Sequence, residues 1–171
     1  MFIKKRFDPE KFKLGMRTVK SSLAVFLVIL LFGILRWEGT NIAALSAVFS
    51  LREDFDKSLH FGTSRILGNS IGGVYALIFF LLSQFFDGHF LVTLFVVPIC
   101  VMLTIMTNVA MDNKAGIIGG VAAMLIITLS IPAGETVQYV FARVFETFVG
   151  VFIAILVNYD VDKLKKYWKH K

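Results

Sequence analysis

Residues 66–86 read ILGNSIGGVYALIFFLLSQFF and contain no Asp, Glu, Lys or Arg. Two further segments, 90–111 and 115–134, are equally free of charged residues. Each segment is about 20 residues long, which is enough for a helix to cross a hydrocarbon core of about 30 Å. The three segments therefore predict an all-α, polytopic membrane protein.

The composition of the 171-residue chain agrees with this fold class. The chain is 57% hydrophobic and 18% charged, with a mean hydropathy of +0.75, whereas soluble proteins are about 45–50% apolar and about 25% charged. The net charge of +6 does not indicate a nucleic-acid-binding surface, because the charges lie between apolar segments. The single cysteine, Cys100, lies inside an apolar segment, and no His or Cys spacing is typical of a metal site. We expect no nucleic-acid partner, no cofactor and no metal ion.

We expect six spans. Residues 1–20 are basic and amphipathic, which is typical of a helix lying on an anionic membrane surface. Residues 21–158 would form the six-helix transmembrane domain, and residues 159–171 a basic cytoplasmic tail. The first span, 21–35, is extended by Lys20, whose side chain we expect to snorkel to the interface.

The second segment is unusually short. Its uncharged part, 39–51, is too short to cross the bilayer as a straight helix. It is either a half-helix or re-entrant segment packed inside protein, or a span that includes the polar residues after it. Six spans place all of the 18 Lys and Arg residues on one side except Arg36 and Arg143. The positive-inside rule then puts both termini in the cytoplasm, which we expect to be that of a bacterial cell with the protein in its inner membrane.

A shift of 78 residues aligns residues 43–77 with 121–155. The shift pairs residues of the same kind: Arg65 with Arg143, and Gly72 with Gly150. The identities are few, so both a true repeat and a chance similarity of apolar helices remain open. A true repeat would divide the protein into two inverted halves of three helices, as in many secondary transporters. The short segment 39–51 would then correspond to residues 119–129.

Two ionisable residues, Arg143 and Glu146, lie inside the last span, 137–158. Each costs at least about 2.5–3.5 kcal/mol near the bilayer centre and therefore faces a cavity or a partner. Three residues apart, they share a helix face and can pair. They are either a neutralising pair that helps packing, or an anion-binding group (Arg143) beside a proton carrier (Glu146). Arg65 is either a snorkelling anchor or a second anion-binding group.

Two small-residue motifs predict close packing of helices, either within the chain or between copies of it. They consist of Gly68 and Gly72, and of Gly116 and Gly120. Asn69 offers a polar group inside a span, for an interhelical hydrogen bond or for a ligand. The chain has no HExxH or other motif of a membrane enzyme, and its connecting segments are too short for a catalytic domain. We expect no enzymatic activity.

Three stretches between residues 12 and 158 resemble a known family. Residues 15–20 read GMRTVK, residues 65–73 read RILGNSIGG, and Arg143 is followed by Gly150 and Asn158. In combination these motifs resemble the aromatic acid exporter family of the FUSC-like (fusaric acid resistance) superfamily. The resemblance implies a six-span unit that exports small aromatic carboxylates with the proton gradient as driving force, and Arg65 and Arg143 match the family pattern.

Two functional hypotheses follow. In the first, the chain exports small organic acids as a homo-oligomer, with Arg143, Arg65 and Asn69 binding the anion and Glu146 coupling transport to protons. In the second, it is a non-transporting scaffold or an accessory subunit, because larger relatives carry a soluble domain or a second six-span unit that is missing here. The expected partners are the lipid bilayer, small organic anions and further copies of the chain.

Overall fold

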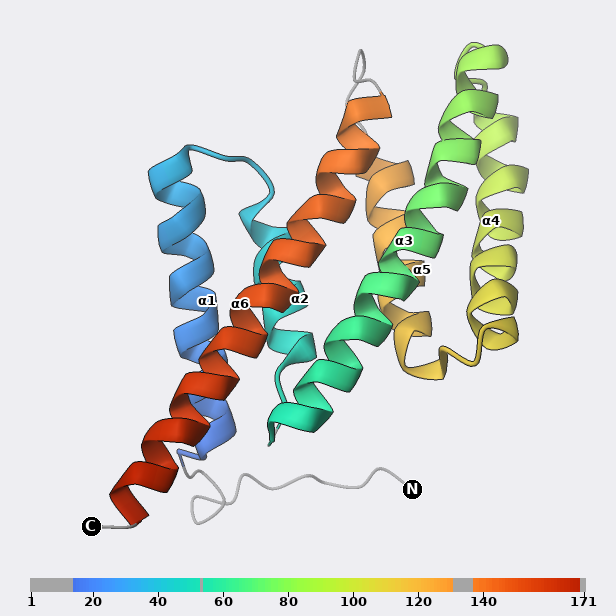
Figure 1. Ribbon diagram of the computed structural model, residues 1–171. Coiled ribbons are helices and arrows are strands. Elements are labelled where there is room, and N and C mark those ends of the chain that lie inside the picture. Colours follow the sequence, from blue (N-terminus) through green and yellow to red (C-terminus); the bar gives the residue numbers. More distant parts are fainter. Residues whose placement is uncertain (1–13, 53, 131–136, 170–171) are drawn as a thin grey trace, which may run out of the picture.

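The computed structural model describes residues 14–52, 54–130 and 137–169, and every regular element in them is helical. The α-helices are α1 (Met16–Leu35), α2 (Thr40–Ser50), α3 (Phe55–Phe85), α4 (Phe90–Ala110), α5 (Ile117–Ser130) and α6 (Val137–Lys169). A short 3₁₀ helix, η2 (Lys114–Gly116), leads directly into α5. Consecutive helices run in opposite directions, so that α1 begins and α6 ends at the same end of the bundle (Figure 1). The predicted all-α architecture with six helices is confirmed, whereas most of the predicted surface segment, residues 1–13, lies outside the described part.

Within the described residues, four helices are long and apolar enough to cross a membrane: α1, α3, α4 and the Val137–Tyr159 part of α6. The described parts of the other two are short, with 11 residues in α2 and 14 in α5. At about 1.5 Å per residue they reach roughly 16 Å and 21 Å, less than the hydrocarbon core of about 30 Å. The short α2 was predicted. The fifth span was expected over 115–134, and its residues 131–134 lie outside the described part of the chain.

The two halves of the chain pack in the same way. In the centre, α3 packs against α5 and α6, and α6 packs against α2. On the flanks, α1 packs against α2 and α6, while α4 packs against α5 and α3 (Figure 1). Exchanging α1 with α4, α2 with α5 and α3 with α6 reproduces this set of contacts. Since the matched helices run in opposite directions, the bundle is the inverted 3+3 repeat that the 78-residue shift suggested.

Backbone contacts at glycine repeat between the halves. A Cβ atom added to Gly72 in α3 would overlap the carbonyl oxygen of Gly120 in α5. A Cβ atom added to Gly150 in α6 would overlap the carbonyl oxygen of Ala43 in α2. Gly72 and Gly150 are 78 residues apart, and Gly120 and Ala43 are equivalent to within one residue. Both short helices are therefore held by a crossing at which backbone touches backbone.

A single hydrogen bond marks the axis that relates the halves. The Asn69 Nδ2 atom in α3 donates to the Thr147 Oγ1 atom in α6 over 2.8 Å, and both side chains are buried. These residues are 78 positions apart, so each contacts its own repeat equivalent. Such a contact occurs where a two-fold axis passes between the partners. The pseudo-two-fold axis therefore runs between α3 and α6 at this bond.

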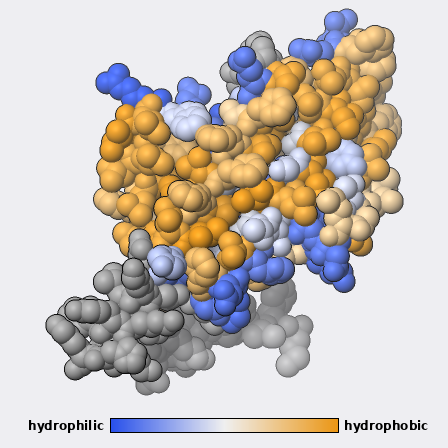
Figure 2. All heavy atoms as spheres, in the orientation of Figure 1, coloured by the Kyte–Doolittle hydropathy of each residue, from blue (hydrophilic) through white to orange (hydrophobic). Residues whose placement is uncertain are grey.

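The face of the molecule seen in Figure 2 is largely apolar across the middle of the bundle, and hydrophilic residues gather toward its two ends. Large apolar side chains are exposed on α1, α4 and α6, among them Phe26, Phe95, Phe141 and Phe152. Soluble proteins rarely expose contiguous apolar surface of this extent. Lipid chains would cover such a surface, which agrees with the membrane-spanning lengths of four helices.

Candidate functional site

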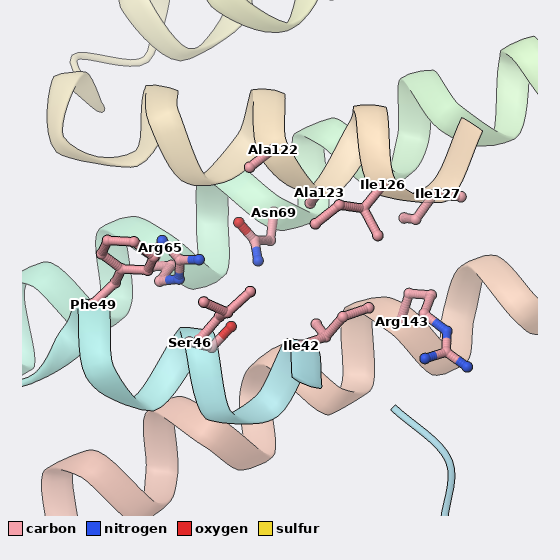
Figure 3. A pocket seen from close by; sticks show the side chains of 11 residues that line it. Ile42, Ser46, Phe49, Arg65, Asn69, Ala122, Ala123, Ile126, Ile127 and Arg143 are labelled. Carbon is pink, nitrogen blue, oxygen red and sulfur yellow. The ribbon is translucent and has the colours of Figure 1, made fainter. Parts of the chain in front are cut away.

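A pocket of about 420 Å³, including its open mouth, lies between the two short helices. Its walls are mostly apolar side chains from α2 and α5: Ile42, Leu45, Phe49, Ala122, Ala123, Ile126 and Ile127. Four polar residues complete the lining: Ser46, Arg65, Asn69 and Arg143. Figure 3 shows Arg65 and Arg143 at opposite ends, with the Asn69 amide between them. The site thus combines apolar walls with a guanidinium group at each end.

Arg65 reaches the pocket from α3. Its guanidinium carbon lies 4.8 Å from the centre of the Phe49 ring in α2, a cation–π contact. A Cβ atom at Gly119 in α5 would lie 3.2 Å from Arg65 Nη1 and 2.9 Å from Asn69 Oδ1, so the absence of a side chain there makes room for both polar groups. Arg65 therefore lies between α2 and α5 at the pocket end. Its Nε atom and the Asn69 Oδ1 atom are buried and have no hydrogen-bond partner among the described residues.

Arg143 and Glu146 form an ion pair at the other end. The Arg143 Nη1 atom donates to Glu146 Oε2 over 3.0 Å, and the Glu146 side chain is fully buried. The Arg143 guanidinium also lies 4.6 Å from the Tyr139 ring centre. Arg143 Nε and Glu146 Oε1 have no hydrogen-bond partner in the described part of the chain. An ion pair that leaves two buried polar atoms unsatisfied is expensive if packing is its only role.

The beginning of α2 also contacts the Glu146 carboxylate. Gly39, just before α2, has a φ of +88°, which favours glycine, and an added Cβ atom there would overlap the carboxylate. The first turn of a helix carries a partial positive charge from its free N–H groups. Glu146 is therefore next to two positive groups, the Arg143 guanidinium and the N-terminus of α2.

Arg143 borders a second, more open pocket. This pocket lies beside the connection between α1 and α2, and its other lining residues are Arg36, Trp37, Glu38, Gln138, Tyr139, Ala142 and Glu146. The residues belong to the end of the bundle where α1 ends and α6 begins (Figure 1). The Arg143–Glu146 pair therefore separates the pocket between the short helices from an opening at this end.

The two arginines are equivalent in the repeat but differ in their surroundings. The 78-residue shift places Gly68 at the position of Glu146, and Gly68 packs directly against the backbone of Gly116. Among the described residues, no carboxylate forms an ion pair with Arg65. The carboxylate beside the arginine is thus present in only one half.

A buried polar network at the opposite end was missed by sequence reasoning. Lys20 Nζ in α1 donates to Asn158 Oδ1 in α6, Asn158 Nδ2 donates to Ser58 Oγ in α3, and Ser58 Oγ accepts from the Arg52 N–H. The prediction that Lys20 snorkels to the interface was wrong, because its side chain is 1% exposed and turned inward to Asn158. The signal lay in the four-residue spacing of the buried face of α1: Lys20, Ala24, Val28 and Phe32.

The described residues contain no cluster of three or more His, Cys, Asp or Glu side chains that could hold a metal ion. The polar groups that line the pocket between the short helices are two guanidinium groups, one amide and one hydroxyl group, and the Glu146 carboxylate pairs with one of the guanidinium groups.

No curated protein and no solved structure matches the chain. The family model described as aromatic acid exporter family member 1 matches residues 12–160. The matched segment contains helices α1 to α5, most of α6, and both arginines of the pocket. The match covers most of a chain that has several membrane-spanning helices and an arginine-lined pocket, and we conclude that the protein is a multi-pass membrane protein belonging to the aromatic acid exporter family.

Proposed function

We propose that the protein exports small aromatic carboxylic acids through the pocket between α2 and α5. The observation that carries the proposal is a pocket with apolar walls and a guanidinium group at each end. An aromatic acid has the matching chemistry, since its carboxylate can bind a guanidinium group through two parallel hydrogen bonds. The apolar side chains of the two short helices would contact the ring. Membership of an exporter family supports the same assignment.

Asn69 would favour acids with a ring hydroxyl group. Its Nδ2 atom already donates to Thr147, whereas its Oδ1 atom is buried next to Gly119 of α5 without a partner among the described residues. A phenolic hydroxyl group could donate to this oxygen while the carboxylate binds Arg65 or Arg143. Hydroxybenzoates are therefore the preferred class of substrate in this proposal, and Asn69→Leu would lower their affinity more than that of benzoate.

The inverted halves provide a route for alternating access. The acid would bind first near Arg65, at the end where α1 begins and α6 ends, and leave past Arg143. The positive-inside rule places the Arg65 end in the cytoplasm of a bacterial cell. Rocking of one half against the other would expose the pocket to each side in turn, as in many inverted-repeat transporters. Glu146 would couple transport to protons.

Transport by the purified protein in proteoliposomes tests the proposal. Vesicles loaded with radiolabelled 4-hydroxybenzoate should release it faster than empty-membrane controls, and the rate should respond to an imposed pH gradient. Arg143→Ala and Arg65→Ala should each slow release roughly 10- to 100-fold, since each removes a charged hydrogen-bond donor of about 1.5–3 kcal/mol. Arg17→Ala removes an exposed arginine of α1 outside the pocket and should leave the rate unchanged. Absence of transport for any aromatic acid would contradict the proposal.

We also propose that the working unit is a homo-oligomer. The small-residue faces of α3 and α5 pack against each other inside the chain. They are therefore used within one copy, and contact between copies would involve exposed aromatic side chains of α6, such as Phe141, Phe145 and Phe152. Native mass spectrometry of the detergent-solubilised protein measures the state. A monomer that transports at the full rate would argue against the oligomer.

A further inference from the structure

Glu146 occupies the position that an exported carboxylate would need. Its carboxylate accepts a hydrogen bond from Nη1 of Arg143 over 3.0 Å and packs against Gly39 at the N-terminus of α2. Arg143 borders both the pocket between the short helices and the opening beside the α1–α2 connection. An acid on its way past Arg143 would present the same chemical group to the same guanidinium. The Glu146 carboxylate and the carboxylate of an exported acid would therefore compete for the same Arg143 guanidinium group.

Two carboxylates cannot both be ionised there at little cost. Glu146 is fully buried, and like charges at close range in a site of low dielectric repel strongly. Protonation of Glu146 would remove this repulsion and release the Nη1 atom of Arg143. The first half of the repeat offers a natural comparison, because Gly68 stands at the position of Glu146 and no carboxylate of the described residues pairs with Arg65.

We propose that Glu146 is a built-in competitor, so that an exported carboxylate binds Arg143 only when Glu146 has taken up a proton. The step is balanced: one proton joins the Glu146 carboxylate, the ion pair to Arg143 opens, and one anion takes its place. When the proton leaves, the restored carboxylate returns to Arg143 and displaces the anion into the outer pocket. This inference rests on the proposed function only for the statement that the acid passes Arg143.

The charged and titratable neighbours of Glu146 are few. Arg143 and Tyr139 lie on its own helix, and Arg36 and Glu38 come from the connection between α1 and α2. The helices α2 and α5, which line the pocket, carry no titratable side chain. On α3, Arg65 lies at the far end of the pocket and the Tyr75 hydroxyl group bonds Thr107 of α4, while Arg17 and Lys20 of α1 belong to the opposite end of the bundle. Glu38 is the neighbouring carboxylate and therefore serves as the matched control.

Binding of formate and benzoate to the purified protein tests the competition. Trp37 lines the outer pocket and lies between Phe32 and Phe145, with ring centres 5.5 Å and 5.4 Å away. The chain has 2 tryptophans, so Trp168→Phe leaves Trp37 as the only indole reporter. Titrations of this variant from about pH 5 to about pH 9 keep both probes ionised, since carboxylic acids of this kind have pKa values near about 4. Calorimetry in buffers of different ionisation enthalpy measures the protons taken up.

The competition predicts a specific pattern. With Glu146 present, formate affinity should fall about tenfold per pH unit at alkaline pH, with about one proton taken up per anion. With Glu146→Gln, the affinity should be independent of pH, no proton should be taken up, and binding at the alkaline end should be at least about tenfold tighter. Glu38→Gln should keep the pH dependence. Equal pH dependence with and without Glu146 would overturn the inference, and so would the absence of formate binding in both proteins.

Two further arms keep the test decisive. If Glu146→Gln does not fold, Glu146→Asp retains the charge but shortens the reach to Arg143, so formate should bind more tightly with the pH dependence preserved; unchanged affinity would overturn the inference. The benzoate arm separates the two proposals. Competition by formate without binding of any aromatic acid would leave the inference standing and contradict aromatic acid export. Transport of aromatic acids together with pH-independent binding would support aromatic acid export and contradict the inference about Glu146.

Discussion

At the scale of single residues, buried polar side chains hold helices that are far apart in the chain. Asn158 is fully buried and joins Lys20 of α1 to Ser58 of α3. Asn158→Ala would remove an acceptor from one buried group and a donor from the other. We expect a loss of about 2 kcal/mol in the free energy of unfolding, because each of the two buried hydrogen bonds that it removes contributes about 0.5–1.5 kcal/mol. Thermal unfolding in a mild detergent measures it.

The control for this prediction is Asn41→Ala. Asn41 is exposed, and its side chain accepts only a local hydrogen bond from the neighbouring Ile42 N–H. Its replacement should change the unfolding temperature little. Equal stability of the two variants would show that the network around Asn158 contributes nothing measurable.

Some contacts of the site residues can be predicted from the sequence alone, and others cannot. The pairing of Arg143 with Glu146 follows from their spacing, because two residues three positions apart share one face of one helix. The roles of Gly39 and Asn69 do not follow, since Gly39 contacts Glu146 and Asn69 contacts Thr147 across different helices. The sequence predicts Lys20 at the interface and gives no sign of its buried acceptor, because Asn158 lies 138 residues away in the chain. Contacts between distant segments have no local pattern from which to predict them.

At the scale of elements, the fit of α3 against α5 depends on the absence of side chains. Gly72→Ala would place a Cβ atom onto the Gly120 carbonyl oxygen, and backbone cannot turn aside as a flexible side chain can. We expect a loss of about 1–3 kcal/mol in the free energy of unfolding, as is typical of overpacking. Gly33→Ala in α1 is the matched control, because an added Cβ atom there meets nothing within 4 Å. A Gly72→Ala variant as stable as this control would contradict the close crossing.

The start of α3 depends on the ionisation of Asp54. Its Oδ1 atom accepts from the Lys57 N–H over 2.8 Å, and this backbone hydrogen bond lowers the pKa of Asp54. A lowered pKa in the folded state means that the carboxylate stabilises the fold above its unfolded pKa, and that this contribution is lost as the pH falls through the folded pKa. Asp54→Asn should therefore be less stable than the wild type at neutral pH, and the difference should shrink on acidification. Thermal unfolding of both proteins from about pH 7 to about pH 3 measures it, and a constant difference would contradict the cap.

At the scale of the whole molecule, the repeat explains more than its few sequence identities could. The 78-residue shift paired Arg65 with Arg143 and Gly72 with Gly150, but apolar helices align easily by chance. The hydrogen bond between Asn69 and Thr147 joins unlike residues at equivalent positions, so no identity search could find it. The symmetry resides in the packing of helices, which tolerates changes of side chain as long as the backbone crossings remain. One departure from it, Glu146 against Gly68, is the feature to which we assign a function.

The orientation of the bundle in the membrane is the final prediction. The turn between α3 and α4 lies at one end of the bundle and the turn between α4 and η2 at the other (Figure 1). All but two of the 18 Lys and Arg residues fall on the second side if six segments cross, so that side should face the cytoplasm. In a Cys100→Ala background, His89→Cys should react with a membrane-impermeant maleimide in intact cells, and Lys114→Cys only after permeabilisation. Unsubstituted Cys100, 2% exposed within α4, should react in neither case. The reverse labelling pattern would show that the protein has the opposite orientation in the membrane. Transport past Arg143 would then lead into the cell rather than out of it.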